Sequence, residues 1–128
     1  MIVKMSTDKT VGEVSAALEA AVEANHFGVM HVHNLKEAMM RKGVEFAHEF
    51  MIYEICEPRQ AKRMLDDNMS VSTMLPCRIS IYEEGGRTFP ATLKPTSLIA
   101  LLDTSQPHGV ARHIEDAIVK IMKEAALA

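Results

Sequence analysis

The spacing of apolar residues alternates between two periods along the chain, and each stretch predicts an element. Apolar residues recur at helical spacing from Val11 to Val22, which predicts a helix ending near Asn25. Thr10 and Glu13 form a capping box in front of that helix. Alternating and β-branched apolar residues predict strands over residues 1–5, 27–33, 46–56, 77–82 and 87–93.

Helix starts and turns separate these strands. Asn34 begins a short helix that Gly43 ends, and Pro58 suits the first position of a third helix. Glu84-Gly85-Gly86 is typical of a hairpin turn between the last two strands. Pro90 cannot donate a ladder hydrogen bond, so its strand is expected at an edge of the sheet or bulged there. A partner could cover that edge.

The order of the elements predicts the fold class. Ser105-Gln106-Pro107 introduces a last helix near residues 109–126, which gives the order β-α-β-α-β-α-β-β-α. We therefore expect an α/β fold of the α+β type, as a single domain over residues 1–128. The hairpin and the long last helix favour a mixed or antiparallel sheet of about five strands, with helices packed on one face.

Composition narrows the possible partners and the location. The net charge of −3 gives no electropositive field, so we expect no nucleic-acid partner. The longest apolar stretch, Leu98 to Leu102, is far shorter than the ~20 residues that span a bilayer, so we expect no membrane partner. Residues 1–6 lack the apolar region of a signal peptide, and the cytoplasm is the expected location. Methionine can fill core gaps or ligate soft metals, and the ten methionines are interpreted as gap-filling residues because they are spread along the chain.

The two cysteines are the main candidate chemistry. Two cysteines in a cytoplasmic domain are expected to be thiols. Cys56 ends a predicted strand just before a helix, and the helix dipole is expected to lower the pKa of its thiol. Cys77 begins another strand, so the two sulfurs could approach if these strands are antiparallel neighbours. The alternative is that both are small buried hydrophobic residues.

Two histidines are candidate metal ligands. His31 and His33 lie on one face of a predicted strand, at a spacing used for chelation. A third ligand is needed, and the candidates are Cys56, Cys77, His48 and Glu54. If the chain has a functional centre, we expect it where Cys56, Cys77 and this histidine face converge. The alternative is two histidines on a solvated face.

The sequence contains no complete catalytic or cofactor motif. It has no glycine pattern that cradles phosphate and no nucleophile elbow. The carboxylate pairs Asp66-Asp67, Glu83-Glu84 and Glu115-Asp116 fall in a predicted turn, a hairpin and a helix surface, so we expect them to face solvent. These observations name no cofactor and favour a protein that is not an enzyme.

Several short phrases together carry a family resemblance. They are His26-Phe27-Gly28-Val29, Cys56-Glu57-Pro58 with Ala61, Leu75-Pro76-Cys77, the Tyr82-to-Gly86 hairpin and Lys94-Pro95-Thr96. With them, essentially the whole chain resembles the uncharacterised family known as domain of unknown function 302. The resemblance implies a compact fold of the TATA-binding-protein-like type and a dimer, and it implies no activity. Members usually have Asn between the first cysteine and its proline, where this chain has Glu57.

The leading hypothesis is a small accessory or binding domain, homodimeric and non-enzymatic. It would use its dimeric surface, or a cleft beside Cys56 and Cys77, to hold a small-molecule ligand that the sequence does not identify. The alternative is a thiol-based protein that handles redox equivalents, sulfur or a soft metal. A hydrolase is a third and weaker interpretation, because the sequence offers no nucleophile–base pair.

Overall fold

The computed structural model describes residues 1–102 and 108–127. Its elements follow the predicted order, with two additions: a 3₁₀ helix before the fourth strand and a short helix before the last helix. The strands are β1 (Ile2–Lys4), β2 (Gly28–Asn34), β3 (Phe50–Cys56), β4 (Cys77–Glu84) and β5 (Arg87–Leu93). The helices are α1 (Val11–Ala24), α2 (Leu35–Arg41), α3 (Pro58–Asp67), the 3₁₀ helix η1 (Met69–Thr73), α4 (Pro95–Ile99) and α5 (His108–Leu127). The segment Ser105-Gln106-Pro107, predicted to introduce the last helix, lies outside the described residues.

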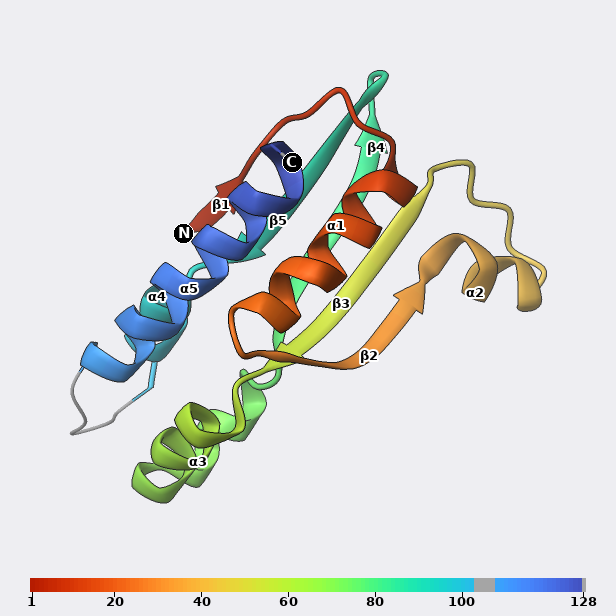
Figure 1. Ribbon diagram of the computed structural model, residues 1–128. Helices are drawn as coiled ribbons and strands as arrows, with labels where there is room; N and C mark the ends of the chain where they lie inside the picture. The colour runs from red at the N-terminus through yellow and green to blue at the C-terminus, as the bar shows by residue number, and fades with distance from the viewer. Residues whose placement is uncertain (103–107, 128) are drawn as a thin grey trace.

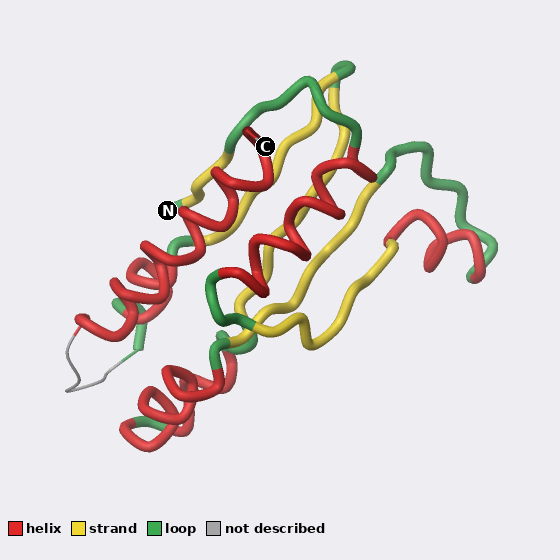
Figure 2. Tube along the Cα trace, viewed as in Figure 1, coloured by secondary structure: helices red, strands yellow, loops and turns green. Residues whose placement is uncertain are grey.

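The five strands form one antiparallel sheet in the order β1-β5-β4-β3-β2. The helices α1 and α5 lie side by side across one face of this sheet (Figure 1). Figure 2 shows α3 and η1 beyond one end of the sheet and α2 beyond the β2 edge. The predicted α/β fold is confirmed, with an antiparallel sheet. We call the sheet face opposite α1 and α5 the open face.

The core lies between the sheet and the two long helices. Its fully buried side chains include Tyr53, Ile55, Ile79, Ile81, Leu18, Ile118, Ile121 and Met122. Burying each such side chain stabilises the fold by about 1.5–3 kcal/mol. Because side chains alternate along a strand, the neighbours Phe50 and Ile52 of β3 project from the open face. Over the residues that the structure describes, no helix is long and apolar enough to cross a membrane.

The helix cap and the hairpin turn that were predicted from short sequence motifs are present in the structure. Glu13 N–H donates to Thr10 Oγ1 at 3.1 Å, and Thr10 N–H donates to Glu13 Oε1 at 3.0 Å, which confirms the capping box. Gly85 and Gly86 have φ values of 61° and 78°, the left-handed region that a two-residue hairpin turn of type I′ requires. The hairpin prediction is also confirmed, because β4 pairs with β5 across this turn.

The prediction that the strand with Pro90 lies at an edge or is bulged there is wrong, since its pairing with β4 passes through Pro90 without a register shift. β5 pairs with β4 on one side and with β1 on the other. Met5 N–H donates to the carbonyl of Pro90 at 3.0 Å, so the side of Pro90 that lacks an N–H faces the first segment of the chain. Regular pairing stops there, since β1 ends at Lys4 and only a bridge between Thr7 and Thr88 follows. Pro90 therefore lacks its N–H at a position where the hydrogen-bond ladder between β1 and β5 is interrupted.

The strand predicted over residues 46–56 is shorter in the structure, where β3 begins at Phe50. The physical reason is that residues 46–49 have no neighbouring strand on one side. β2 pairs Asn34 with Met51 and then turns directly into α2, so residues 46–49 have no strand beside them on that side. On the other side, Glu83 N–H still donates to the Glu49 carbonyl at 3.2 Å.

Candidate functional site

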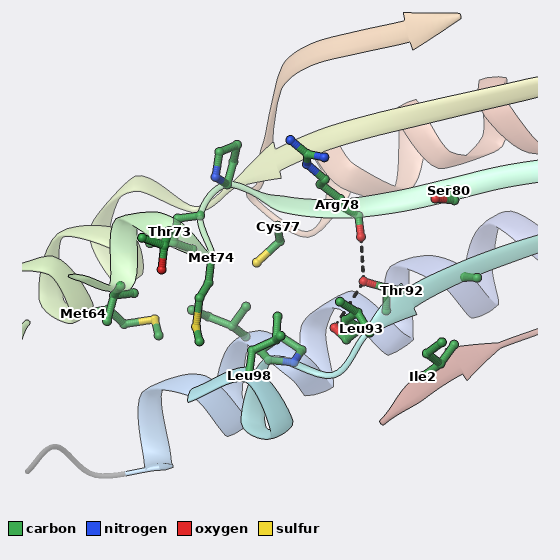
Figure 3. A pocket seen from close by; sticks show the side chains of 16 residues that line it. Ile2, Met64, Thr73, Met74, Cys77, Arg78, Ser80, Thr92, Leu93 and Leu98 are labelled. Carbon is green, nitrogen blue, oxygen red and sulfur yellow. Dashed lines mark hydrogen bonds between the residues drawn. The ribbon is translucent and has the colours of Figure 1, made fainter. Parts of the chain in front are cut away.

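A cavity of about 530 Å³ lies at the end of the sheet where β4 begins and β5 ends. Its walls come from these two strands, α4, η1 and the connection over residues 74–76 (Figure 3). Apolar side chains dominate the lining, among them Val71, Leu75, Leu98 and Ile114. Small-molecule sites in proteins have volumes of roughly 300–1,000 Å³ and mostly apolar walls. The cavity therefore has the size and chemistry of a ligand site.

Glu115 of α5 holds α4 in place beside this cavity. Its Oε1 accepts the N–H of Thr96 at 3.2 Å and the hydroxyl of Thr96 at 2.6 Å. Glu115 is only 8% exposed, so the prediction that this carboxylate faces solvent is wrong. A buried carboxylate needs hydrogen-bond donors, and the first turn of α4 supplies them. This contact joins α4 to α5 next to Pro95 and Ile114, which line the cavity.

Cys77 is the sequence-predicted candidate that lines the cavity. It is the first residue of β4, and its side chain points into the cavity (Figure 3). Burial, together with the nearby Cys56, raises the pKa of the Cys77 thiol to about 11. At neutral pH Cys77 therefore presents a neutral, polarisable thiol rather than a thiolate.

Cys56 lies next to Cys77 in the sheet but on the opposite face. The strands β3 and β4 are antiparallel neighbours, and Ile55 is the register partner of Cys77. Cys56 follows Ile55, so alternation turns its side chain away from the face that Cys77 occupies. Both cysteines are free thiols, and Cys56 is not among the residues that line the cavity.

The prediction that the helix start lowers the pKa of Cys56 is wrong. Burial, and next the charge of Glu57, raise that pKa above its ordinary value. Glu57 is the N-cap of α3, and its Oε2 accepts the N–H of Gln60 at 2.6 Å. A carboxylate thus takes the position at the helix start where the thiolate was expected to gain stabilisation.

A Glu57→Gln variant is expected to lower the pKa of Cys56, because it removes the negative charge that opposes the thiolate. The measurement is the pH dependence of alkylation in a Cys77→Ser background, where Cys56 is the remaining thiol. Glu45→Gln makes the same change at an exposed position and should leave the profile unmoved. An identical Cys56 profile in the Glu57→Gln variant would contradict this account.

The two candidate histidines lie together on the open face. Their rings contact at a centroid distance of 4.4 Å, and His31 is the register partner of Glu54. Glu54 Oε1 lies 3.5 Å from His33 Nε2 and 3.2 Å from a guanidinium nitrogen of Arg78. The structure thus brings the histidines to Glu54 and Arg78, while Cys77 faces the other side of the sheet. Among the described residues, no three His, Cys, Asp or Glu side chains are grouped to hold a metal ion.

Sequence reasoning missed two methionines of the site. Met64 of α3 and Met74, which follows η1, line the cavity together with Cys77. Both were interpreted as residues that fill core gaps, because methionines occur throughout the chain. The signal that could have identified Met74 is its position three residues before Cys77, on the same short connection into β4.

Comparisons with known proteins agree on a family. The family described as "Domain of unknown function DUF302" matches residues 3–125. The crystal structure of an uncharacterized conserved protein DUF302 from Bacillus stearothermophilus is similar, with a TM-score of 0.91 and 27% sequence identity. The match covers 97% of this chain and 97% of that one. No curated protein matches this chain.

Proposed function

The chain belongs to the DUF302 family of domains of unknown function, and we propose that it is a non-enzymatic binding domain for a small ligand. The observation that carries this proposal is the cavity of about 530 Å³ beside Cys77. Its apolar walls favour an apolar or amphipathic ligand, since burial of apolar surface is the main driving force that such a site offers. Two free thiols are in keeping with a protein of the cytoplasm.

Thiol redox chemistry is a weaker candidate for the same site. A nucleophilic or redox-active cysteine has to populate its thiolate near neutral pH. Burial raises the pKa of Cys77 to about 11 and also raises the pKa of Cys56. The charged neighbour that affects the pKa of Cys56 is the carboxylate of Glu57, which raises this pKa further. Binding, rather than nucleophilic attack, is the use that this environment supports.

A thermal-shift screen of small apolar and amphipathic compounds tests the proposed function. A compound that occupies the cavity should raise the melting temperature of the wild type and of Cys56→Ser, but not of Cys77→Leu. Leucine removes the thiol and fills part of the space into which Cys77 points. At a concentration about 100 times Kd, a ligand stabilises the folded state by about 2.7 kcal/mol. For a domain of this size, that corresponds to a shift of about 10 °C.

The matched cysteine variants make the outcome decisive. Cys56 lies outside the cavity lining, so its serine variant controls for the loss of a thiol. If Cys77→Leu does not fold, Leu98→Phe fills the same cavity from α4. Compounds that stabilise the wild type and the filled variants equally, or a screen without any stabilising compound, would overturn the proposal.

We also propose that the protein is a homodimer joined through the open face. Three aromatic rings form a strip across that face. Phe50 and Tyr82 stack at 5.1 Å, Phe89 lies 5.8 Å from Tyr82, and Lys4 Nζ lies 4.5 Å from the Phe89 centroid. We call Phe50, Tyr82 and Phe89 the aromatic strip. An aromatic strip of this kind, on a sheet face that α1 and α5 leave uncovered, is typical of an interaction surface.

The exposed ends of β1 and β5 extend this surface towards the cavity. Ile2 and Leu93 are register partners, with 62% and 44% of their surface exposed. Both also line the cavity, as do Ser80 and Ala91 of the same face. A second copy seated on the open face would therefore cover part of the cavity mouth. Dimerisation and ligand binding are linked in this proposal.

A further inference from the structure

The hydrogen-bond ladder between β4 and β5 stops at the wall of the cavity. Their register ends at the pair of Ser80 and Ala91, although β4 begins at Cys77 and β5 runs on to Leu93. Arg78 and Leu93 would form the next pair that exchanges hydrogen bonds, and both residues line the cavity. The sheet therefore has a gap in its ladder where the proposed ligand site lies. We call the positions of Arg78 and Leu93 the ladder gap.

The backbone groups of Arg78 and Leu93 turn towards each other across the ladder gap. Pro90 has no N–H, and its carbonyl accepts the N–H of Met5 at 3.0 Å, so the backbone of Pro90 faces the β1 side. Successive residues of a strand turn their N–H and C=O groups to opposite sides, so Leu93 faces β4. The carbonyl of Arg78 accepts the hydroxyl of Thr92 at 2.6 Å, so the backbone of Arg78 faces β5.

Hydrogen bonding in the ladder gap is incomplete. A bond from the Arg78 N–H to the Leu93 carbonyl would extend the register to Ile79 and Thr92, and the register does not include that pair. Instead, the Thr92 hydroxyl donates to the Arg78 carbonyl at 2.6 Å and lies 3.4 Å from the Leu93 carbonyl (Figure 3). Within the part of the chain that the structure describes, the Arg78 N–H thus has no ladder partner. Such donors are rare in folded proteins and take a partner from water or a ligand.

We infer that the Arg78 N–H donates to a carbonyl oxygen of the ligand, so that the ligand is an uncharged ketone, ester or amide with an apolar body. The ligand oxygen would take the place that the Leu93 carbonyl has in a continuous ladder. The apolar body would lie on other lining side chains, such as Leu98 and Ile114. A few polar groups within mostly apolar walls are typical of small-molecule sites. This inference rests on the proposed function, since it names the chemical class of the ligand in the same cavity.

The charges around the cavity favour an uncharged ligand. Among the described residues that line it, Arg78 is the one with a charge at neutral pH, and its guanidinium lies 3.2 Å from Glu54 Oε1 on the open face. The guanidinium is therefore paired with a carboxylate rather than directed at the ligand. Cys77 points into the cavity as a neutral thiol, because burial raises its pKa to about 11. A carboxylate ligand would meet no unpaired cation among these residues, and burying an unpaired charge is far more costly than burying a carbonyl.

Two substitutions at one position test the inference. Arg78→Pro and Arg78→Ala both remove the guanidinium, but only proline also removes the backbone N–H. Proline is tolerated in a strand where the N–H makes no ladder bond, so Arg78→Pro should fold. The probes are benzophenone and diphenylmethane, which are similar in size and differ in that a CH₂ group replaces the carbonyl.

Titration of ¹⁵N-labelled protein, followed by nuclear magnetic resonance, measures the affinities. We expect Arg78→Pro to bind benzophenone about 10-fold more weakly than Arg78→Ala does, because it loses one hydrogen bond. Diphenylmethane should bind the two variants equally. In the wild type, the Arg78 amide proton should move downfield with benzophenone and not with diphenylmethane. This last measurement needs no variant, so it decides the question if Arg78→Pro does not fold.

The outcomes separate this inference from the proposed function. Equal benzophenone affinities of Arg78→Pro and Arg78→Ala, or an Arg78 amide proton that benzophenone does not move, would overturn the inference. If diphenylmethane then still binds the wild type and not Cys77→Leu, the proposed function stands. A wild type that does not bind benzophenone also overturns the inference, and the thermal-shift screen then decides the proposed function. If no compound binds in either experiment, both fall.

Discussion

A Tyr82→Asp variant is expected to be monomeric at concentrations where we expect the wild type to form the proposed homodimer. Tyr82 is the middle ring of the aromatic strip, between Phe50 and Phe89. A carboxylate there would be buried in an apolar interface without a partner, which costs several kcal/mol. The interface of a two-fold dimer contains the same residue twice, so both copies bear this cost. We expect dissociation to be favoured by roughly 100-fold or more.

Light scattering coupled to size-exclusion chromatography measures this effect. Met69→Asp is the matched control, since it adds the same charge at a side chain that is 73% exposed on η1, away from the aromatic strip. The control should remain a dimer. A wild type that is monomeric at about 100 μM, or a Tyr82→Asp variant that stays dimeric, would contradict the proposed interface.

The second large effect concerns the reactivity of Cys77. Burial raises the pKa of its thiol from an ordinary value of 9.0 to about 11. At pH 8 this difference lowers the thiolate fraction by about 100-fold, and the thiolate is the form that reacts with alkylating reagents. We expect Cys77 in the native protein to be alkylated at least about 100-fold more slowly than in the urea-unfolded chain.

Mass spectrometry after timed alkylation resolves the two cysteines. The pKa of Cys56 is also raised, but Cys56 is less buried, so it should react before Cys77. Unfolding should make the alkylation rates of Cys56 and Cys77 similar, because the pKa values of both thiols then return to their ordinary range. Equal rates for Cys77 in the native and the unfolded chain would show that the cavity does not shield the thiol.

The sequence predicted most elements because their signals are local. The Thr10–Glu13 capping box, Pro58 at the start of α3 and the Gly85-Gly86 turn each act within four residues of the chain. The cap, the helix start and the turn that these residues form therefore depend little on the rest of the fold. Prediction failed for Pro90, because the position of β5 inside the sheet depends on β1, which lies more than 80 residues earlier. Strand order is a long-range property that a local breaker residue does not determine.

The candidate site was only partly predictable for the same reason. The sequence led us to expect that the strands of Cys56 and Cys77 are antiparallel neighbours, and the register pairs Cys77 with Ile55, the residue next to Cys56. Their separation onto two faces depends on a register difference of one residue, which the sequence does not specify. The charge of Glu57 and the donors that Glu115 finds on α4 are tertiary effects. A cavity, likewise, exists only once distant elements have packed.

The central claim is that the cavity beside Cys77 is where this protein binds its ligand. Nuclear magnetic resonance of protein labelled with ¹³C in the methionine methyl groups tests it most directly, using the most stabilising compound from the thermal-shift screen. The methyl resonances of Met64 and Met74, which line the cavity, should move on binding. The methyl resonances of Met40 and Met69, which lie elsewhere and are 63% and 73% exposed, should not shift. Shifts confined to Met40 or Met69, with Met64 and Met74 unmoved, would contradict the account.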